Sequence, residues 1–422
     1  MTQHGRAPRT NNLAMNFVTL HDDASPQSPT DDHGQIRFGI ARCEFLENYF
    51  EQRWLLRRGA IHGAAFRWSD VDELLYRIDP VAPDLQLFQD GEVSNAEFVD
   101  QVQERGVQRR RINKAAFYDR MSRGATLVFN RLEERSLYSK RLCGEISRFV
   151  GHPASGNAYL SFGGNGTFGK HWDTHDVFVI QLLGTKRWQV FAPTMPLPLS
   201  YQTSAPYRGQ APTFPALDIK LNVGDVLYIP RGWWHHVTPC EVGSLHLSIG
   251  VYPPTTIDYL QWLTSRRLTT VEAARAGIGD FDLASLKTEA LEAPLIEGMR
   301  DPNLLAMYRK SLLDGERPRS EFNLALLLEA GQAELPGQTF VALNNCYAHA
   351  DTIELVLARS NSQDVQSLQQ RELRRVLLEF LATVTVTRLH DVYARVRDAA
   401  HSDVCMTLLN LARYDVVTLW RE

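Results

Sequence analysis

The residues of this sequence with the clearest chemical potential are two histidines and one aspartate. His171-x-Asp173 is followed much later by His235, at the end of the segment Pro230-Arg-Gly-Trp-Trp-His. Two imidazoles and one carboxylate can occupy one face of an octahedral metal ion and leave the opposite face open. Non-haem Fe(II) oxygenases need this arrangement, because a cosubstrate and O2 must both bind the iron. We therefore consider His171, Asp173 and His235 candidate iron ligands.

The segments around these residues favour β-strands. Residues 177–183 are mostly apolar and β-favouring, and Gly184 ends this run. Residues 187–191 predict a second strand. His171 and Asp173 are two residues apart, so their side chains leave the same face of an extended backbone.

One lysine stands out beside the candidate ligands. Lys186 follows His171 by fifteen residues, just past the turn between the two predicted strands, and the chain has only seven lysines against 38 arginines. A cation at this position can face the same cavity and hold the distal carboxylate of a dicarboxylate cosubstrate. Downstream, a Gly224-Asp225 turn precedes an apolar strand. A Pro-x-Gly bend then directs His235 back towards the barrel that we expect these strands to form.

Taken together, these blocks resemble the JmjC/cupin-4 branch of the 2-oxoglutarate oxygenases, the group that contains the ribosomal oxygenases. The resemblance is dense from about Phe45 to Val251. The matching blocks are Gly-Ala-Thr126-Leu-Val, Asn157-Ala-Tyr159-Leu, His171-Trp-Asp173, Asp176-Val-Phe-Val-Ile-Gln, Gly184-Thr-Lys186-Arg-Trp, Tyr228-Ile-Pro-Arg-Gly-x-x-His235 and Leu245-His-Leu-Ser-Ile-Gly250.

The resemblance implies specific roles for the metal and cosubstrate residues. His171, Asp173 and His235 match the iron ligands of the family, and Lys186 matches the basic residue that pairs with the C5 carboxylate of 2-oxoglutarate. The implied enzyme is an Fe(II)- and 2-oxoglutarate-dependent dioxygenase. It would hydroxylate a side chain of a protein or peptide, a ribosomal protein being one candidate, with succinate and CO2 as coproducts.

The resemblance also points to substrate contacts, and the sequence departs from the family there. Asn157 and Tyr159 match an Asn-x-Tyr pair that contacts the target side chain in histidine-hydroxylating members. Gly250 stands where we expect those enzymes to have a serine that helps hold the target, which weakens the case for a histidine target. Lys170 precedes the first ligand, where the family often has proline.

Three further histidines compete for roles at the site. His175 as a fourth ligand would close a position that O2 chemistry needs, so we expect it beside the metal site or in a structural role. His236 neighbours His235, but strand alternation directs it the other way. His246 has apolar neighbours, and core packing, support of the site and substrate contact all remain open for it.

Two other functions remain as alternatives. The same chemistry can act on a biosynthetic precursor peptide, a free amino acid or a methylated lysine. A non-catalytic cupin that only binds its partner would need a broken triad or a missing cosubstrate cation, and this sequence has neither.

Composition indicates a globular protein. The 422 residues exceed one ordinary core, 44% are hydrophobic and 22% charged, and the net charge of −4 indicates no general attraction to nucleic acid or anionic membranes. No apolar run approaches the ~20 residues of a membrane span. We expect a cytoplasmic protein, because the N-terminus shows no signal-peptide pattern and the cysteines occur singly: Cys43, Cys143, Cys240, Cys346 and Cys405.

The predicted fold class is α+β, built on a double-stranded β-helix of the jelly-roll, cupin or JmjC type. We expect a disordered tail over residues 1–34 and a catalytic domain over residues 35–255. Short strands between Gly and Pro turns place the β-helix core at about residues 125–251. Residues 256–330 are predicted to be helical and to mediate homodimerisation, and residues 331–422 to form a winged-helix-like domain.

Local signals support this division. Asp301-Pro302 predicts the start of a helix that ends at Gly315. A strand at 340–343 with another at 353–357, three helices (373–381, 387–396 and 404–411) and a terminal strand at 415–419 give the order of a winged helix. Residues 404–411 contain no Lys or Arg, so protein interaction or a structural role is favoured over DNA binding. For the 256–330 helices, packing within one subunit is the alternative to a dimer.

Two predictions concern the N-terminal part. Ser69 is a candidate cap for a helix over residues 71–78. Asn95 and Ala96 predict the start of a helix that extends to Val102.

Overall fold

The computed structural model describes residues 35–62, 66–163, 166–240, 243–279, 287–315, 320–322, 324, 335–344 and 368–421. The tail predicted for residues 1–34 and the strand predicted for residues 353–357 lie outside the described residues. The helices are α1 (Arg42–Asn48), α2 (Trp68–Arg77), α3 (Lys114–Ser122), α4 (Leu137–Val150), α5 (Thr256–Arg267), α6 (Glu272–Arg275), α7 (Glu289–Arg300), α8 (Pro302–Gly315), α11 (Leu368–Ala382), α12 (Leu389–Arg395) and α13 (His401–Arg413). The strands are β1 (Leu55–Arg57), β2 (Leu85–Phe88), β3 (Val99–Glu104), β4 (Val107–Ile112), β5 (Thr126–Phe129), β6 (Ala154–Ser161), β7 (Asp176–Leu183), β8 (Lys186–Phe191), β9 (Leu217–Leu221), β10 (Val226–Ile229), β11 (Trp234–Pro239), β12 (Ser244–Val251), β13 (Phe340–Leu343), β14 (Thr387–Arg388) and β15 (Val417–Trp420).

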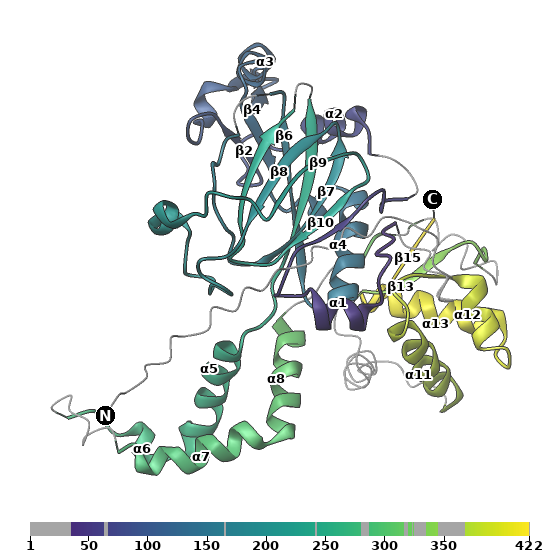
Figure 1. Cartoon of the computed structure of the whole chain (residues 1–422). Coiled ribbons are helices and arrows are strands. Elements are labelled where there is room, and N and C mark those ends of the chain that lie inside the picture. The colour runs from purple at the N-terminus through teal and green to yellow at the C-terminus, as the bar shows by residue number, and fades with distance from the viewer. Residues whose placement is uncertain are drawn as a thin grey trace, which may run out of the picture.

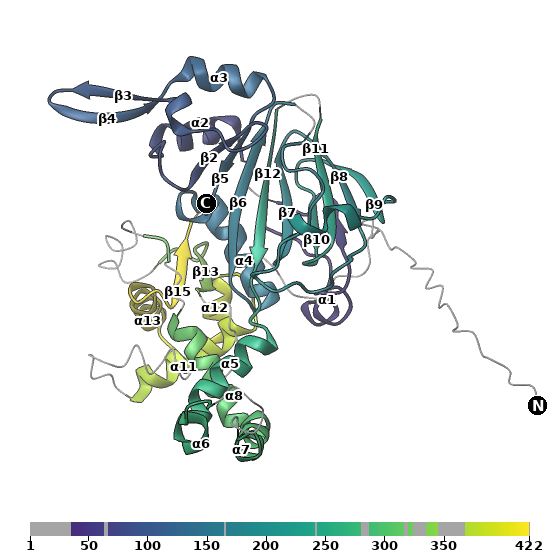
Figure 2. The same ribbon diagram turned by 90° about the vertical axis from the view of Figure 1, so that its left-hand side faces the viewer.

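Two antiparallel sheets form the barrel. The larger sheet has the strand order β1-β10-β7-β12-β6-β5-β2, and the smaller has the order β11-β8-β9. Figure 2 shows β12 at the centre of the larger sheet, between β6 and β7. β7 and β8 fall where the sequence predicted two strands, with Gly184 at a positive φ of 60° in the turn between them. This turn favours glycine because a side chain there would be strained.

Alternation along the strands separates an inner face from an outer face. On β7, Val177 and Val179 pack into an apolar cluster with Trp188 and Val190 of β8, between the two sheets. The intervening Phe178 and its neighbours belong to the main core. That core joins the outer face of the larger sheet to α4, which lies against the sheet in Figure 1. The interior of the barrel is therefore walled by side chains of both sheets.

The N-terminal part corrects two predictions. Asn95 begins only a short 3-10 helix, and residues 99–104 form strand β3, which pairs with β4 in the hairpin that projects in Figure 2. The turn at Arg105 and Gly106, both at positive φ, closes this hairpin and favours strand over helix. Ser69 lies inside α2, whose N-cap is Arg67.

The C-terminal half is largely helical. α8 spans Pro302–Gly315, as predicted, and α5, α6, α7 and α8 extend away from the barrel in Figure 1. β13, β14 and β15 form a small antiparallel sheet, and α11, α12 and α13 pack with it around a separate apolar core. The predicted helices and the terminal strand of this region are therefore present, within a few residues of their expected bounds.

No helix in the part of the chain that the structure describes has both the length and the apolar character needed to cross a membrane.

Candidate metal and cosubstrate site

The structure brings His171, Asp173 and His235 together. One ligand atom from each lies within 4.8 Å of the others, and no other such group of three occurs among the described residues. The Asp173 carboxylate oxygens lie 3.9 Å from Nε2 of His171 and 3.6 Å from Nε2 of His235, and the two imidazole centroids are 4.3 Å apart. These separations are too long for hydrogen bonds. They suit three donors that share one cation.

The backbone fixes this geometry. His171 and His235 pair as an isolated antiparallel bridge, with N–H to carbonyl distances of 3.1 and 2.7 Å. The N–H of Gly232 donates to the carbonyl of Asp173 at 3.0 Å, and Gly232 has a φ of 82°. A Cβ at position 232 would lie 2.3 Å from the carbonyl oxygen of Met195, so the Pro-x-Gly bend admits only glycine here.

Backbone carbonyls also select the histidine tautomers. Nδ1 of His171 lies 3.0 Å from the carbonyl oxygen of Gly169, and Nδ1 of His235 lies 3.3 Å from that of Trp233. Because a carbonyl only accepts, each Nδ1 carries the proton and each Nε2 presents a lone pair. Both Nε2 atoms are the ones that face Asp173.

The protonation states match a metal site. Burial and the neighbouring His171 lower the pKa of His235 to about 4. Burial raises the pKa of Asp173, but His235, His171 and His175 outweigh it and the net pKa is lowered. At neutral pH the cluster therefore presents a neutral imidazole of His235 and an ionised carboxylate, the forms that bind metals.

Of the three further histidines, His175 and His236 lie outside the cluster as follows. The His175 ring stacks on Tyr252 with 5.0 Å between the ring centroids. His236 lies beside Gly166, where an added Cβ would be 3.5 Å from its Nε2.

Lys186 is the first residue of β8, and its side chain is almost fully buried at 2% exposure. Its Nζ donates to the carbonyl oxygen of Tyr159 at 2.8 Å and lies 2.9 Å from Nδ1 of His246. Lys186 forms no salt bridge with any carboxylate in the described part of the chain. Burial lowers its pKa to about 7. A buried cation without an anionic partner is costly, and an anionic ligand would relieve that cost.

Asn157 and Tyr159 lie on the same face of β6. Oδ1 of Asn157 accepts from the backbone N–H of Arg131 at 3.0 Å, and Arg131 has a positive φ of 50°. The ring of Tyr159 stacks on His246 at 5.0 Å, and Phe168 meets it edge-on at 5.8 Å. Burial raises the pKa of Tyr159, so its hydroxyl is neutral at physiological pH.

The glycine that departs from the family pattern has a structural explanation. A Cβ at position 250 would lie 2.6 Å from Cδ2 of His175 and 2.9 Å from the hydroxyl of Tyr252. The His175–Tyr252 pair therefore occupies the space that a side chain at position 250 would need.

Lys170 has a structural role as well. Its Nζ donates to the carbonyl oxygen of Pro212 at 2.8 Å and lies 3.7 Å from the ring centroid of Phe191.

Sequence reasoning missed Trp188. Its ring stacks on His235 at 5.8 Å and meets His246 edge-on at 5.3 Å, so it links the metal cluster to the histidine that contacts Lys186. Its buried Nε1 has no hydrogen-bond partner among the described residues. The period of two along β8 was an available signal, because Lys186 and Trp188 share a face.

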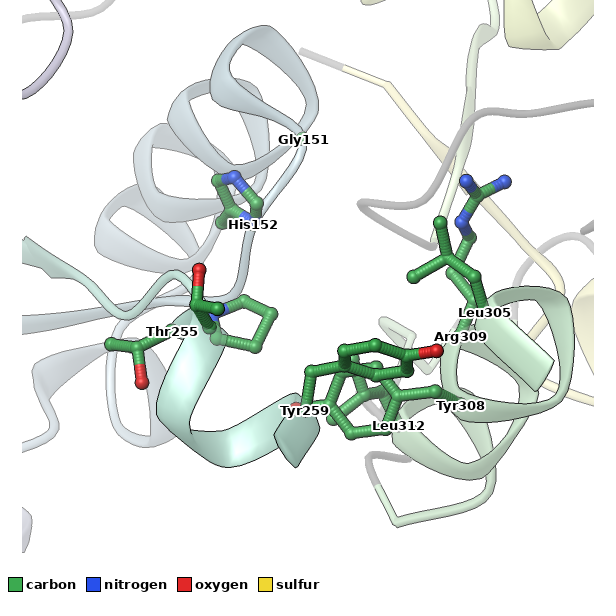
Figure 3. A pocket seen from close by; sticks show the side chains of 10 residues that line it. Gly151, His152, Thr255, Tyr259, Leu305, Tyr308, Arg309 and Leu312 are labelled. Atoms are coloured by element: carbon green, nitrogen blue, oxygen red, sulfur yellow. The ribbon is translucent and has the colours of Figure 1, made fainter. Parts of the chain in front are cut away.

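A separate cavity lies away from this site. It has a volume of about 310 Å³ and forms where the end of α4 meets α5 and α8 (Figure 3). Figure 3 shows Tyr259 and Tyr308 beside one another on one side and His152 on the other. Its lining contains no member of the metal cluster.

Comparison with known proteins identifies the family of one part of the chain. Residues 132–259 match the JmjC domain family. A Drosophila persimilis protein named bifunctional lysine-specific demethylase and histidyl-hydroxylase NO66 is 35% identical over 114 residues, 27% of this chain and 16% of that protein. Ribosomal oxygenase 2 of Mus musculus is 33% identical over 130 residues, 30% of this chain and 27% of that protein. The chain thus matches only about a sixth to a quarter of the length of these relatives.

The fold also matches a solved structure over most of the chain. The crystal structure of Escherichia coli ribosomal oxygenase YcfD superposes with a TM-score of 0.51 and 16% identity, covering 92% of this chain and 99% of that one. A further structure of YcfD, with a TM-score of 0.50 and 15% identity over 91% and 99%, contains cobalt and 2-oxoglutarate. The predicted JmjC/cupin fold is confirmed.

Proposed function

We propose that this chain is an Fe(II)- and 2-oxoglutarate-dependent dioxygenase that hydroxylates a side chain of a protein or peptide, with succinate and CO2 as coproducts. The observation that carries the proposal is a two-histidine, one-carboxylate cluster inside the same barrel as a buried lysine that has no anionic partner among the described residues. The named oxygenases among its relatives, and the YcfD structure with cobalt and 2-oxoglutarate, support it.

Each residue of the site has a defined task in this proposal. His171, Asp173 and His235 hold the metal through Nε2, a carboxylate oxygen and Nε2. The bound iron supplies O2 activation coupled to oxidative decarboxylation of 2-oxoglutarate. The Lys186 ammonium binds the far carboxylate of the cosubstrate by a charge-assisted bond, strengthened by the low dielectric of the interior. Trp188 and its apolar neighbours exclude water from the space between them.

We place the target side chain beside Asn157 and Tyr159, on the inner face of β6. A protein target, such as a ribosomal protein, is favoured by the resemblance to ribosomal oxygenases. His175 and Tyr252 fill the space beside Gly250 where histidine-hydroxylating members of the family are expected to have a serine side chain. We therefore do not assign a histidine target. A precursor peptide, a free amino acid or a methyl-lysine is the alternative substrate class.

The proposed domain organisation is a catalytic domain (35–255), a helical dimerisation region (256–330) and a winged-helix-like domain (331–422). Apolar side chains that stay exposed on α5, α7 and α8 support the second assignment: Ile257, Ile296, Met299, Leu305 and Met307.

Cys43, Cys143, Cys240 and Cys405 form no disulfide among the described residues, which supports a cytoplasmic location.

The test is anaerobic addition of Fe(II) and 2-oxoglutarate to metal-free protein. We expect a weak visible metal-to-ligand charge-transfer band in the wild type and its loss in His235→Ala. His236→Ala is the matched control and should keep the band, because His236 lies outside the cluster. Metal binding without any band in the wild type would contradict the oxygenase proposal and favour a binding-only cupin.

A further inference from the structure

We infer that His246 is a positioning residue for the cosubstrate, because it fixes Lys186 in the orientation that receives the far carboxylate. This inference rests on the proposed function and adds a residue to it. His246 lies on β12, which is hydrogen-bonded between β6 and β7, and its neighbours across the sheet are Tyr159 and Gln181. His246 is therefore held on an interior strand of the larger sheet, at a point where the register between β12 and β7 shifts.

The hydrogen bonds of Lys186 define the first step. An ammonium group has three N–H donors, and two of them are directed at the carbonyl oxygen of Tyr159 and at Nδ1 of His246. One donor is left for an incoming ligand. With the other two held, that donor has a fixed direction instead of rotating freely about the end of a four-carbon side chain.

The charge of His246 provides the second step. Because Lys186 Nζ donates to Nδ1, the ring must be the neutral tautomer with its proton on Nε2. Burial and the adjacent Lys186 lower the pKa of His246 well below its usual value, which keeps the ring neutral. A neutral acceptor orients the ammonium without neutralising it. An aspartate in this place would form an ion pair and compete with the cosubstrate.

The packing of the ring provides the third step. Tyr159 stacks on it with 5.0 Å between centroids and an interplanar angle of 10°, and Trp188 meets it at 5.3 Å and 85°. Two aromatic contacts at right angles leave the imidazole little freedom to rotate. A phenylalanine at position 246 would pack in the core as well as a histidine does. The hydrogen bond from Nζ of Lys186, however, requires a nitrogen or oxygen acceptor on this side chain.

The experiment compares His246→Phe, which keeps a ring but removes the acceptor, with His246→Asn, whose side-chain oxygen can take the place of Nδ1. The affinity of the full-length Fe(II)-loaded protein for 2-oxoglutarate is measured by anaerobic titration of the charge-transfer band. We expect His246→Phe to weaken 2-oxoglutarate binding about tenfold or more, corresponding to about 1.4 kcal/mol, and His246→Asn to recover most of it.

A second ligand separates positioning from general damage to the site. 2-Oxopentanoate has the same keto-acid end and chain length but lacks the far carboxylate, so His246→Phe should bind it as the wild type does. Thermal melting of both variants checks that they fold.

Three outcomes overturn the inference. The first is that His246→Phe binds 2-oxoglutarate within twofold of the wild type. The second is that His246→Phe loses affinity for 2-oxoglutarate and for 2-oxopentanoate by the same factor. The third is that His246→Phe and His246→Asn lose the same affinity for 2-oxoglutarate, because the hydrogen-bond acceptor would then not be the cause of the loss. If the wild type itself shows no 2-oxoglutarate-dependent band, the proposed function fails; a normal wild-type band with an unaffected His246→Phe overturns only the role of His246.

Discussion

At the scale of single residues, the site combines groups whose charge is set by burial. The imidazole of His235 is kept neutral, the carboxylate of Asp173 is kept ionised, and Lys186 lacks an anionic partner in the described part of the chain. A metal dication would be held by one negative charge, and a dicarboxylate would bring the counter-charge that Lys186 lacks. The charges of these residues therefore suit a divalent cation together with a dicarboxylate.

The lysine leads to a pH prediction. Burial lowers the pKa of Lys186 to about 7, so above this pH the free protein holds it mostly neutral. Binding of a carboxylate requires the ammonium form, and the protein must then take up a proton. We expect the Kd for 2-oxoglutarate to be nearly constant below pH 7 and to rise about tenfold per pH unit above it.

Anaerobic titrations between pH 6 and 9 measure this dependence. Lys186→Arg is the comparison, because a guanidinium stays charged across this range and its binding should lose the steep dependence even if it is weaker overall. A wild-type Kd that does not change up to pH 9 would contradict the prediction.

At the scale of elements, a polar network ties together three segments, two of which adjoin the metal-ligand residues in the sequence. The Tyr228 hydroxyl on β10 donates to Oδ1 of Asp176, the first residue of β7, at 2.6 Å, and accepts from the backbone N–H of Glu51 at 2.8 Å. Glu51 also forms an ion pair with Arg231 at 2.5 Å. The network connects the strand ends that lead into Asp173 and His235, and so it supports their relative placement.

This network makes stability depend on pH. Burial raises the pKa of Asp176 to about 7, although the Tyr228 hydrogen bond lowers it. A carboxyl with a raised native pKa gives stability that is fully present below its unfolded pKa near 4 and is lost as the pH rises through about 7. The full difference is about 4 kcal/mol for a shift of about three units.

Tyr228→Phe should therefore destabilise the protein more at pH 8 than at pH 5, because it removes the donor that stabilises the ionised carboxylate. We expect a loss of about 1–3 kcal/mol at pH 8. Thermal melts at the two pH values measure it, with Tyr201→Phe as the control because Tyr201 is 77% exposed. An equal loss at both pH values would show that the ionised form of Asp176 is not involved.

At the scale of the whole molecule, the helices α5 to α8 extend from the barrel (Figure 1). Several of their apolar side chains are exposed. On α7, Ile296 is 48% and Met299 is 56% exposed, and their spacing of three residues places them on one side of the helix. Gly298 between them is buried, where an added Cβ would lie 3.0 Å from Leu263 of α5. The buried face holds the helices together, and the exposed face is available to a second copy.

We expect the protein to form a homodimer of twice 47.9 kDa through this surface. The double variant Ile296→Glu with Met299→Glu should be monomeric, since four buried charges across a two-fold interface cost far more than the lost apolar contact stabilises. Light scattering after size-exclusion chromatography measures the mass. Tyr76→Glu, at a residue of α2 that is 91% exposed, is the control. A monomeric wild type would rule out the dimer and favour packing within one subunit.

The amino-acid sequence by itself determined the parts of this protein that depend on local spacing. The strands β7 and β8, the helix α8 and the convergence of His171 with Asp173 follow from the period of two in strands, from Gly184 and from Pro302. The resemblance placed His235 and Lys186 in the same site. The local helix signal gave a wrong prediction at residues 95–102, because a turn at Arg105 and Gly106 pairs residues 99–104 with the following strand.

Only the tertiary structure decided what supports these residues. His246 lies 60 positions from Lys186, and its role in the core or in the site was open from the sequence. Only the facing of the two sheets brings Nδ1 of His246 on β12 to Nζ of Lys186 on β8. The occupation of the space over Gly250 by His175 and Tyr252 is equally non-local. The physical reason is that a strand's sequence sets which side chains share a face, whereas the order and register of strands set which faces meet.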